Sequence, residues 1–311
     1  MKPDFPPLSA GVLTTEAVNP NSVQIDTLSP HDIVRLMNEE DSTIPAAVAA
    51  ETESIARAIE VITDRLGNDG RLIYIGAGTS GRFGVLDASE CPPTFNTPPE
   101  LVVGVIAGGD SALRKSAESV EDHPERGAED LKGNCLTARD VVVGIATSGR
   151  TPYVIGAMEY AQSVGAFAIG LACNEGSALS QTADLMITPI TGPEIISGST
   201  RMKAGTATKM ILNMLTTGTM VQLGKTYGNL MVDLRATNTK LVARSRRLMA
   251  SLTGLSEIQA EAELLKCGGE LKTAVVMIQR GVNVDKARDI LRSCNHQLRR
   301  ALDETVDGAS L

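Results

Sequence analysis

The feature that most constrains the fold is an alternation of short apolar runs and helical segments between residues 71 and 190. The apolar runs are Leu72–Ile75, Leu101–Ile106, Val141–Ile145, Ala166–Leu171 and Leu185–Ile190. None of them alternates polar and apolar residues, which is typical of strands covered on both faces. Segments of crossover length separate the runs, and this predicts an α/β fold with a doubly wound, parallel five-stranded sheet. Ligands of such sheets bind at the carboxyl ends of the strands.

Helical segments flank the predicted sheet on both sides. Ser29-Pro30 and Thr43-Ile44-Pro45 are helix-start signals, the second opening a long helix over Ala46–Leu66. After Asn229 the pattern is helical, for example over Ser256–Cys267 and Val284–Cys294. We therefore predict an N-terminal irregular segment with helices (1–66), a sheet domain (67–228) and a small helical C-terminal domain (229–311). The N-terminal helices are expected to pack against a neighbouring element or a second subunit.

Composition excludes several classes of function. Aromatic residues are only 3% of the chain and the net charge is −8, which disfavours a nucleic-acid or anionic-membrane binder. The apolar stretch Ala204–Leu223 contains Lys209 and Asn213, so it is expected to be a buried helix and not a membrane span. The N-terminus has no apolar signal-peptide region, and five widely spaced cysteines fit reduced thiols in the cytoplasm.

A glycine-rich turn follows the first apolar run and leads into a helix. Gly76-Ala-Gly-Thr-Ser-Gly81 fits the spacing of a dinucleotide-binding turn, which is a weak signal by itself. Gly78 allows close approach to the helix start, where unpaired N–H groups and the hydroxyls of Thr79 and Ser80 suit one phosphoryl group.

A second turn of the same make follows the third apolar run. Thr147-Ser-Gly-Arg150 repeats the tetrapeptide Thr79-Ser-Gly-Arg82, and Thr151-Pro152 then opens a helix. We expect Ser148, Gly149 and Thr151 to converge with the first turn on one phosphate-binding crevice. A third hydroxyl-rich segment, Ser197–Lys203, precedes the long apolar helix. The alternative for each turn is that its hydroxyls only cap helices.

At this level of detail the chain resembles a known family. The twin Thr-Ser-Gly-Arg turns are similar to those of the sugar isomerase (SIS) fold, which binds phosphosugars. Longer strings resemble the bacterial N-acetylmuramic acid 6-phosphate etherases, over nearly the whole chain from about Thr15. These strings are Gly76–Arg82, Leu86–Thr94, Ser148–Tyr153, Ser199–Thr206 and Gly228–Asp233. The resemblance implies cleavage of a lactyl ether with no metal and no cofactor, by a homodimer with a shared site.

Two glutamates are the candidate catalytic residues. Glu90 lies at the expected end of the first phosphate-binding helix, where Pro92-Pro93 is predicted to stop it; negative charge at a helix C-terminus is unfavourable and so suggests a function. The resemblance assigns Glu121 to the second catalytic position, with Glu118 as the alternative. It also implies that Glu90 protonates the leaving oxygen and Glu121 takes a proton from C2, although the reverse assignment is equally consistent with the residues.

Other candidates keep two interpretations. Ser199 is predicted to bind the substrate. Arg201 and Lys203 are predicted to pair with the lactyl carboxylate, but a structural ion pair fits them equally well. Asn229 and Asp233 are interpreted as caps of the next helix. For the whole chain, the alternatives to a lyase are a non-catalytic phosphosugar-sensing regulator, similar to the glucokinase regulatory protein, and an aldose–ketose phosphosugar isomerase.

Overall fold

The computed structural model describes residues 13–115, 117, 119–233 and 239–303. Two compact units make up this part of the chain. The first takes residues up to Ser89 together with Pro99–Thr216, and the second takes Glu90–Pro98 together with residues from Thr217 onward. The division of the chain at residues 66 and 228 stays a prediction.

The first unit is built on a five-stranded parallel sheet, which confirms the predicted fold class. Its strands are β1 (Leu72–Gly76), β2 (Val102–Ile106), β3 (Val141–Ile145), β4 (Phe167–Leu171) and β5 (Leu185–Ile187), in the spatial order β2-β1-β3-β4-β5. In the register, Gly76 lies opposite both Ile106 and Ile145. The carboxyl ends of the three strands β2, β1 and β3 are therefore level with one another.

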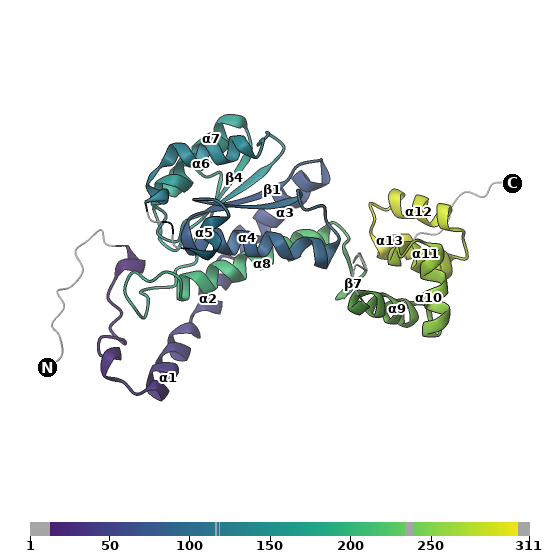
Figure 1. Cartoon of the computed structure of the whole chain (residues 1–311), viewed down its shortest axis with the longest axis horizontal. Helices are drawn as coiled ribbons and strands as arrows, with labels where there is room; N and C mark the ends of the chain where they lie inside the picture. Colours follow the sequence, from purple (N-terminus) through teal and green to yellow (C-terminus); the bar gives the residue numbers. More distant parts are fainter. Residues whose placement is uncertain (1–12, 116, 118, 234–238, 304–311) are drawn as a thin grey trace. The chain divides into compact units, whose positions relative to one another are not determined.

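Helices cover both faces of the sheet (Figure 1). α6 (Pro124–Gly133) and α7 (Pro152–Val164) pack on one face, where Tyr153, Val154 and Met158 join the strand residues in a fully buried apolar core. On the other face, α4 (Gly78–Phe95) lies so close that a Cβ on Gly84 would be 2.8 Å from Cβ of Tyr74 in β1. α8 (Lys203–Gln222) lies beside α4. No helix that the structure describes has the length and apolar character needed to cross a bilayer.

Further elements complete the first unit. They are the 3-10 turns η1 (Thr14–Glu16), η2 (Ile25–Thr27), η3 (Val120–Asp122) and η4 (Ala178–Gln181), and the helices α1 (Pro30–Asp41), α2 (Ile44–Ala49), α3 (Thr52–Gly67) and α5 (Ser111–Arg114). Ser29 caps α1 as predicted, because its side chain accepts a hydrogen bond from the N–H of Asp32 at 3.2 Å.

The predicted single helix over Ala46–Leu66 is wrong, because the chain breaks between α2 and α3. Glu51 leaves the helical conformation there, and its carboxylate accepts a hydrogen bond from the N–H of Thr188 at 2.9 Å. The N–H of Thr188 is the first one after β5, which ends at Ile187. The next residue, Pro189, has no N–H to donate. A contact between residues 137 positions apart therefore lies at both boundaries.

The prediction that Pro92-Pro93 ends the first phosphate-binding helix is also wrong. α4 continues through both prolines to Phe95, and the N–H of Asn96 still bonds the carbonyl of Pro92 at 3.0 Å. The chain leaves the helical conformation at Asn96, whose φ of 53° lies in the left-handed region. Glu90 is consequently more than one turn from the end of α4, and the unfavourable dipole argument does not apply to it.

The second unit holds five helices among its described residues: α9 (Thr239–Thr253), α10 (Glu257–Lys266), α11 (Leu271–Arg280), α12 (Val284–Ser293) and α13 (Leu298–Asp303). α10 and α12 confirm the two predicted helices, and Ser256 with Gln259 forms a capping box on α10. The prediction of an all-helical pattern after Asn229 is wrong at its start, because β6 (Thr226–Tyr227) and β7 (Leu230–Met231) pair as a short hairpin. Gly228, at φ 56°, supplies the left-handed conformation that its turn requires.

Asp233 has a different role from the predicted helix cap. Its carboxylate pairs with Lys272 at 2.9 Å and with Lys225 at 3.0 Å. Burial opposes ionisation of this carboxyl group, but the two ammonium groups lower its pKa overall. The ion-pair cluster fastens the segment after β7 to α11 within the second unit.

A buried carboxylate accepts several hydrogen bonds at the amino edge of the sheet. Asp140 accepts hydrogen bonds from the N–H of Arg71 at 2.9 Å, from its guanidinium at 2.8 Å and from the N–H of Thr137 at 2.9 Å. Burial raises the pKa of Asp140, but the bonds from Arg71 and Thr137 outweigh it and lower the pKa below its ordinary value.

We expect Asp140→Asn to destabilise the protein by about 2–4 kcal/mol near pH 7, because Arg71 loses its charged partner. A lowered pKa in the folded state means that the carboxylate stabilises the fold above its ordinary value of 3.8 and loses this contribution as the pH falls. Urea unfolding from about pH 7 to about pH 3 should show the difference between variant and wild type shrinking below about pH 4. A difference that is constant with pH contradicts this account.

Candidate active site

Two hydroxyl-rich turns lie at the topological switch point of the sheet. The chain leaves β1 for β2 on one side and then crosses to β3 on the other side of β1. The turns after Gly76 and after Ile145 therefore leave neighbouring strands at the same edge, where open α/β sheets bind ligands. The structure thus brings together the two segments that the sequence predicts to share a crevice.

In the first turn, Gly78 begins α4 with a left-handed φ of 52° that an L side chain rarely adopts. Thr79 is half-buried and Ser80 is buried in the first turn of that helix. Within the described part of the chain neither hydroxyl hydrogen-bonds to protein. Both hydroxyls are therefore available to a ligand at the positive end of the α4 dipole.

The second turn is more tightly packed at Gly149 than the first is at Gly78, where a Cβ would meet nothing within 4 Å. Gly149 has φ 69°, and a Cβ at this position would lie 2.2 Å from Cβ of Ser177. Ser148 accepts a hydrogen bond from the N–H of Arg150 at 3.2 Å, which leaves its own O–H to donate. Thr151 is the N-cap residue of α7, but its side chain makes no capping hydrogen bond. The helix-cap alternative is therefore absent for Thr151.

The third hydroxyl-rich segment is organised by a buried carboxylate. Glu194 is fully buried and accepts hydrogen bonds from the N–H groups of Lys203 at 2.8 Å and Ala204 at 3.0 Å. Burial raises the pKa of Glu194, and these two N–H donors oppose that shift. The carboxylate of Glu194 therefore already caps the start of α8. The starts of α4 and α7 differ from it in this respect.

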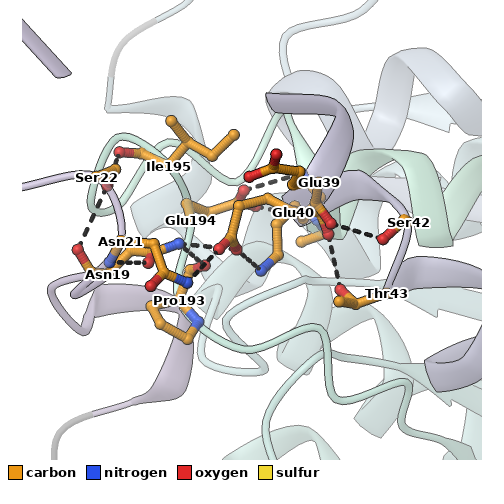
Figure 2. A network of polar contacts seen from close by, with 12 residues as sticks. Asn19, Asn21, Ser22, Glu39, Glu40, Ser42, Thr43, Pro193, Glu194 and Ile195 are labelled. Atoms are coloured by element: carbon orange, nitrogen blue, oxygen red, sulfur yellow. Dashed lines mark hydrogen bonds and ion pairs between the residues drawn. The ribbon is translucent and has the colours of Figure 1, made fainter. Parts of the chain in front are cut away.

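A polar network joins the same segment to the N-terminal region (Figure 2). The ammonium group of Lys203 lies 2.8 Å from Oε2 of Glu40, at the end of α1, and the two side chains are only 4% and 11% exposed. Asn19 and Asn21 donate further hydrogen bonds to Glu40 at 2.9 Å and 2.7 Å. The structural ion pair that the sequence left open for Lys203 is present. Arg201 is exposed, and Ser199 is half-buried.

The N-terminal segment contributes polar residues that sequence reasoning missed. Thr15, Asn19 and Ser22 are buried, and Ser22 donates to the carbonyl of Ile195 at 2.7 Å. Asn174, after β4, bonds Thr15 at 3.1 Å and the carbonyl of Thr147 at 3.0 Å. Residues 13–22 therefore hold the loops after β3, β4 and β5. Sequence offered only the turn-forming run Asn19-Pro20-Asn21-Ser22 as a signal.

The two predicted catalytic glutamates are both exposed. Glu121 lies in η3, after β2, and Glu90 lies on α4. Glu90 groups with the second compact unit and Glu121 with the first, so their pairing stays a prediction. Glu118 lies outside the described residues. Among the residues that the structure does describe, no three His, Cys, Asp or Glu side chains are grouped to hold a metal ion.

A buried hydrogen-bond network supports α4 one turn before Glu90. Asp87 accepts from the hydroxyl of Tyr74 in β1 at 3.0 Å and from Asn213 in α8 at 2.6 Å. Burial raises the pKa of Asp87, while these hydrogen bonds oppose the shift. The network fixes α4 to both the sheet and α8 through side chains whose polar groups are satisfied.

We expect Lys203→Met to destabilise the protein by about 3 kcal/mol, because it leaves Glu40 charged and buried without its cation. Urea unfolding should show this loss, and the double variant Glu40→Met/Lys203→Met should lose less than the sum of the two single variants. The control is Arg57→Met, which removes an exposed ion pair with Glu60 and should unfold like wild type. Equal effects of Lys203→Met and Arg57→Met argue against a stabilising role for the buried pair.

Three family models match: the glucokinase regulatory protein N-terminal SIS domain over residues 54–162, the SIS domain over 123–218, and the C-terminal lid domain of glucokinase regulatory protein over 228–268.

Near full-length relatives are N-acetylmuramic acid 6-phosphate etherases. The one from Rhodopirellula baltica is 60% identical over 93% of this chain and 96% of its own length. That from Streptomyces avermitilis is 56% identical, over 93% of each chain. Among solved structures, a phosphoheptose isomerase from Francisella tularensis aligns with a TM-score of 0.48 and 20% identity, over 60% of this chain and 98% of its own.

Proposed function

The chain belongs to the N-acetylmuramic acid 6-phosphate etherase family, and on this premise we propose that it is a lyase of amino-sugar recycling. It cleaves the D-lactyl ether of N-acetylmuramic acid 6-phosphate and releases N-acetylglucosamine 6-phosphate and D-lactate. The observation that carries the proposal is the 60% identity, over 93% of the chain, to a relative with this name. The two hydroxyl-rich turns, which leave the paired strands β1 and β3 at the same edge of the sheet, support it.

The phosphoryl group is bound by the turns after β1 and β3. Gly78 and Gly149 allow the backbone to approach it, and the hydroxyls of Thr79, Ser80, Ser148 and Thr151 donate to its oxygens. Neutral donors at the starts of α4 and α7 suit a small dianion, because the dipole of each helix adds to the hydrogen bonds. The third segment supplies Ser199 and Arg201 to the lactyl carboxylate, while Lys203 holds that segment through Glu40.

Chemistry then takes place at the neighbouring carbons. In the open-chain sugar the C2 hydrogen lies α to the C1 aldehyde, so a carboxylate can remove it. Glu121 takes this proton, and Glu90 protonates the lactyl oxygen as its bond to C3 breaks. Water then adds at C3 of the unsaturated aldehyde. Both carboxyl groups are exposed and so can reach a substrate.

We also propose that the protein works as a homodimer in the cytoplasm. α1 has no buried residue, and Val34 on it is 59% exposed, which leaves an apolar helix face for a second copy. The five cysteines are widely spaced along the chain, which suits reduced thiols in a reducing compartment. Measurement of the mass in solution tests the dimer.

We expect Thr151→Val and Ser80→Ala to weaken phosphosugar binding about 10–100-fold each, because each removes a donor to a charged group. The inhibition constant of N-acetylglucosamine 6-phosphate measures this loss. Ser163→Ala is the matched control, since it removes a hydroxyl from the opposite end of α7, where it bonds only the carbonyl of Tyr160. Unchanged inhibition in both variants would exclude these hydroxyls from the phosphate site.

We expect Glu90→Gln and Glu121→Gln each to lower kcat for lactate release by about 10²–10⁴-fold while phosphosugar binding survives. Glu129→Gln, which removes an exposed carboxylate from α6, should keep wild-type turnover. Wild-type reaction in heavy-oxygen water should place the label at C3 of the product, as elimination followed by hydration requires. Binding without lactate release would instead favour a regulator, and a ketose phosphate product would favour an isomerase.

A further inference from the structure

The two Thr-Ser-Gly-Arg turns use their arginines differently. Arg82, in the first turn of α4, donates from Nη2 to the carbonyl of Ala112 at 2.7 Å and of Lys115 at 3.2 Å, and from Nε to Leu113 at 3.2 Å. Arg150 is exposed, and its guanidinium has no partner within the described part of the chain. The repeated tetrapeptide therefore conceals two distinct roles.

The carbonyls that Arg82 binds belong to the last turn of α5 and the residue after it. α5 has only four residues, too few for a helix to be stable without tertiary contacts. Its final carbonyls have no intrahelical donors and carry the negative end of the helix dipole, so a guanidinium satisfies them both by hydrogen bonding and by charge. Figure 1 shows α5 lying against α4, which carries Arg82.

α5 leads directly to the segment that carries Glu121. Ala117 and Val120, which lie between α5 and Glu121, pack on the turn after β2, where a Cβ on Gly108 would lie 3.3 Å from Cβ of Ala117 and 3.7 Å from Cγ1 of Val120. Val120, next to Glu121, also packs against the core beneath α7. The chain that leads to Glu121 is thus held at two places, by the hydrogen bonds from Arg82 to the end of α5 and by the apolar packing of Ala117 and Val120.

We propose that Arg82 is a positioning residue, which ties the Glu121 segment to the phosphate-binding turn of α4. Thr79 and Ser80 lie within three residues of Arg82 on the same helix turn. One turn of α4 therefore holds the phosphoryl group with its hydroxyls and sets the place of the base through its guanidinium. This inference rests on the proposed function, because it assigns Arg82 to the proton-transfer step of that reaction.

The test compares steady-state kinetics of lactate release for the full-length wild type, Arg82→Met and Arg82→Lys. Misplacing a catalytic group by about 1 Å costs about 100-fold, so we expect kcat of Arg82→Met to fall about 100-fold while KM changes less than about threefold. Arg82→Lys keeps the charge but loses the planar fork, and its kcat should recover to about tenfold below wild type. If Arg82→Met does not fold, the same division between kcat and KM is read from Arg82→Lys.

Two control variants separate positioning from general stability. Arg71→Met removes a guanidinium that also binds backbone carbonyls, those of Asn134 at 3.1 Å and Cys135 at 3.0 Å, but at the amino edge of the sheet. It should lower the melting temperature and keep kcat within about twofold. Arg114→Met removes an exposed guanidinium from α5 itself and should change neither quantity.

The outcomes distinguish this inference from the proposed function. If the wild type releases no lactate, the proposed function fails, and the inference fails with it. If the wild type is active and Arg82→Met keeps its kcat, only the inference is overturned. A rise in KM of Arg82→Met at unchanged kcat also overturns it, because that result would place the guanidinium on the phosphoryl group.

Discussion

The parallel pairing of β1 with β3 is the constraint on which the rest of the first unit depends. Backbone hydrogen bonds align Gly76 with Ile145, so the two strands end level with each other. The chain can then begin α4 and α7 at one edge of the sheet, and the positive ends of two helix dipoles lie at the switch point. Without this register, the two similar turns would not begin at the same edge of the sheet.

Polar side chains, and not apolar packing alone, hold the loops around that edge. Glu194 caps α8, Lys203 and the two asparagines satisfy Glu40, and Asn174 joins the N-terminal segment to the turn after β3. Except for the exposed Asn21, each of these residues is buried or half-buried, so removing one partner leaves another polar group unsatisfied. Such networks are rigid because they stabilise only one arrangement of their members. A site for a small charged ligand benefits from this rigidity, since less order must be gained on binding.

Local sequence patterns predicted most of the sheet, because buried strands and helix starts depend on the identity of neighbouring residues. The strands, the start of α1 at Ser29-Pro30 and the capped helices α10 and α12 all follow from short-range signals. The errors arose where distant contacts overrode those signals. Glu51 breaks a good helical pattern to bond Thr188, and α4 continues through Pro92 and Pro93 until Asn96 turns left-handed. Hydrophobic periodicity cannot contain such information. In the first case the partner that decides the boundary lies far away in the sequence, and in the second the boundary depends on an unusual backbone angle.

The sequence by itself determined the fold class, the two hydroxyl-rich turns and the family, because those depend on residue order within short segments and on identity along the chain. Only the tertiary structure decided which polar groups are already used. It assigns Lys203 to Glu40 and Arg82 to the carbonyls of α5, and it leaves the hydroxyls of Thr79, Ser80 and Thr151 without hydrogen-bond partners among the described residues. The physical reason is that a side chain's availability depends on every donor and acceptor within about 3.5 Å, and folding brings these together from segments that the sequence separates.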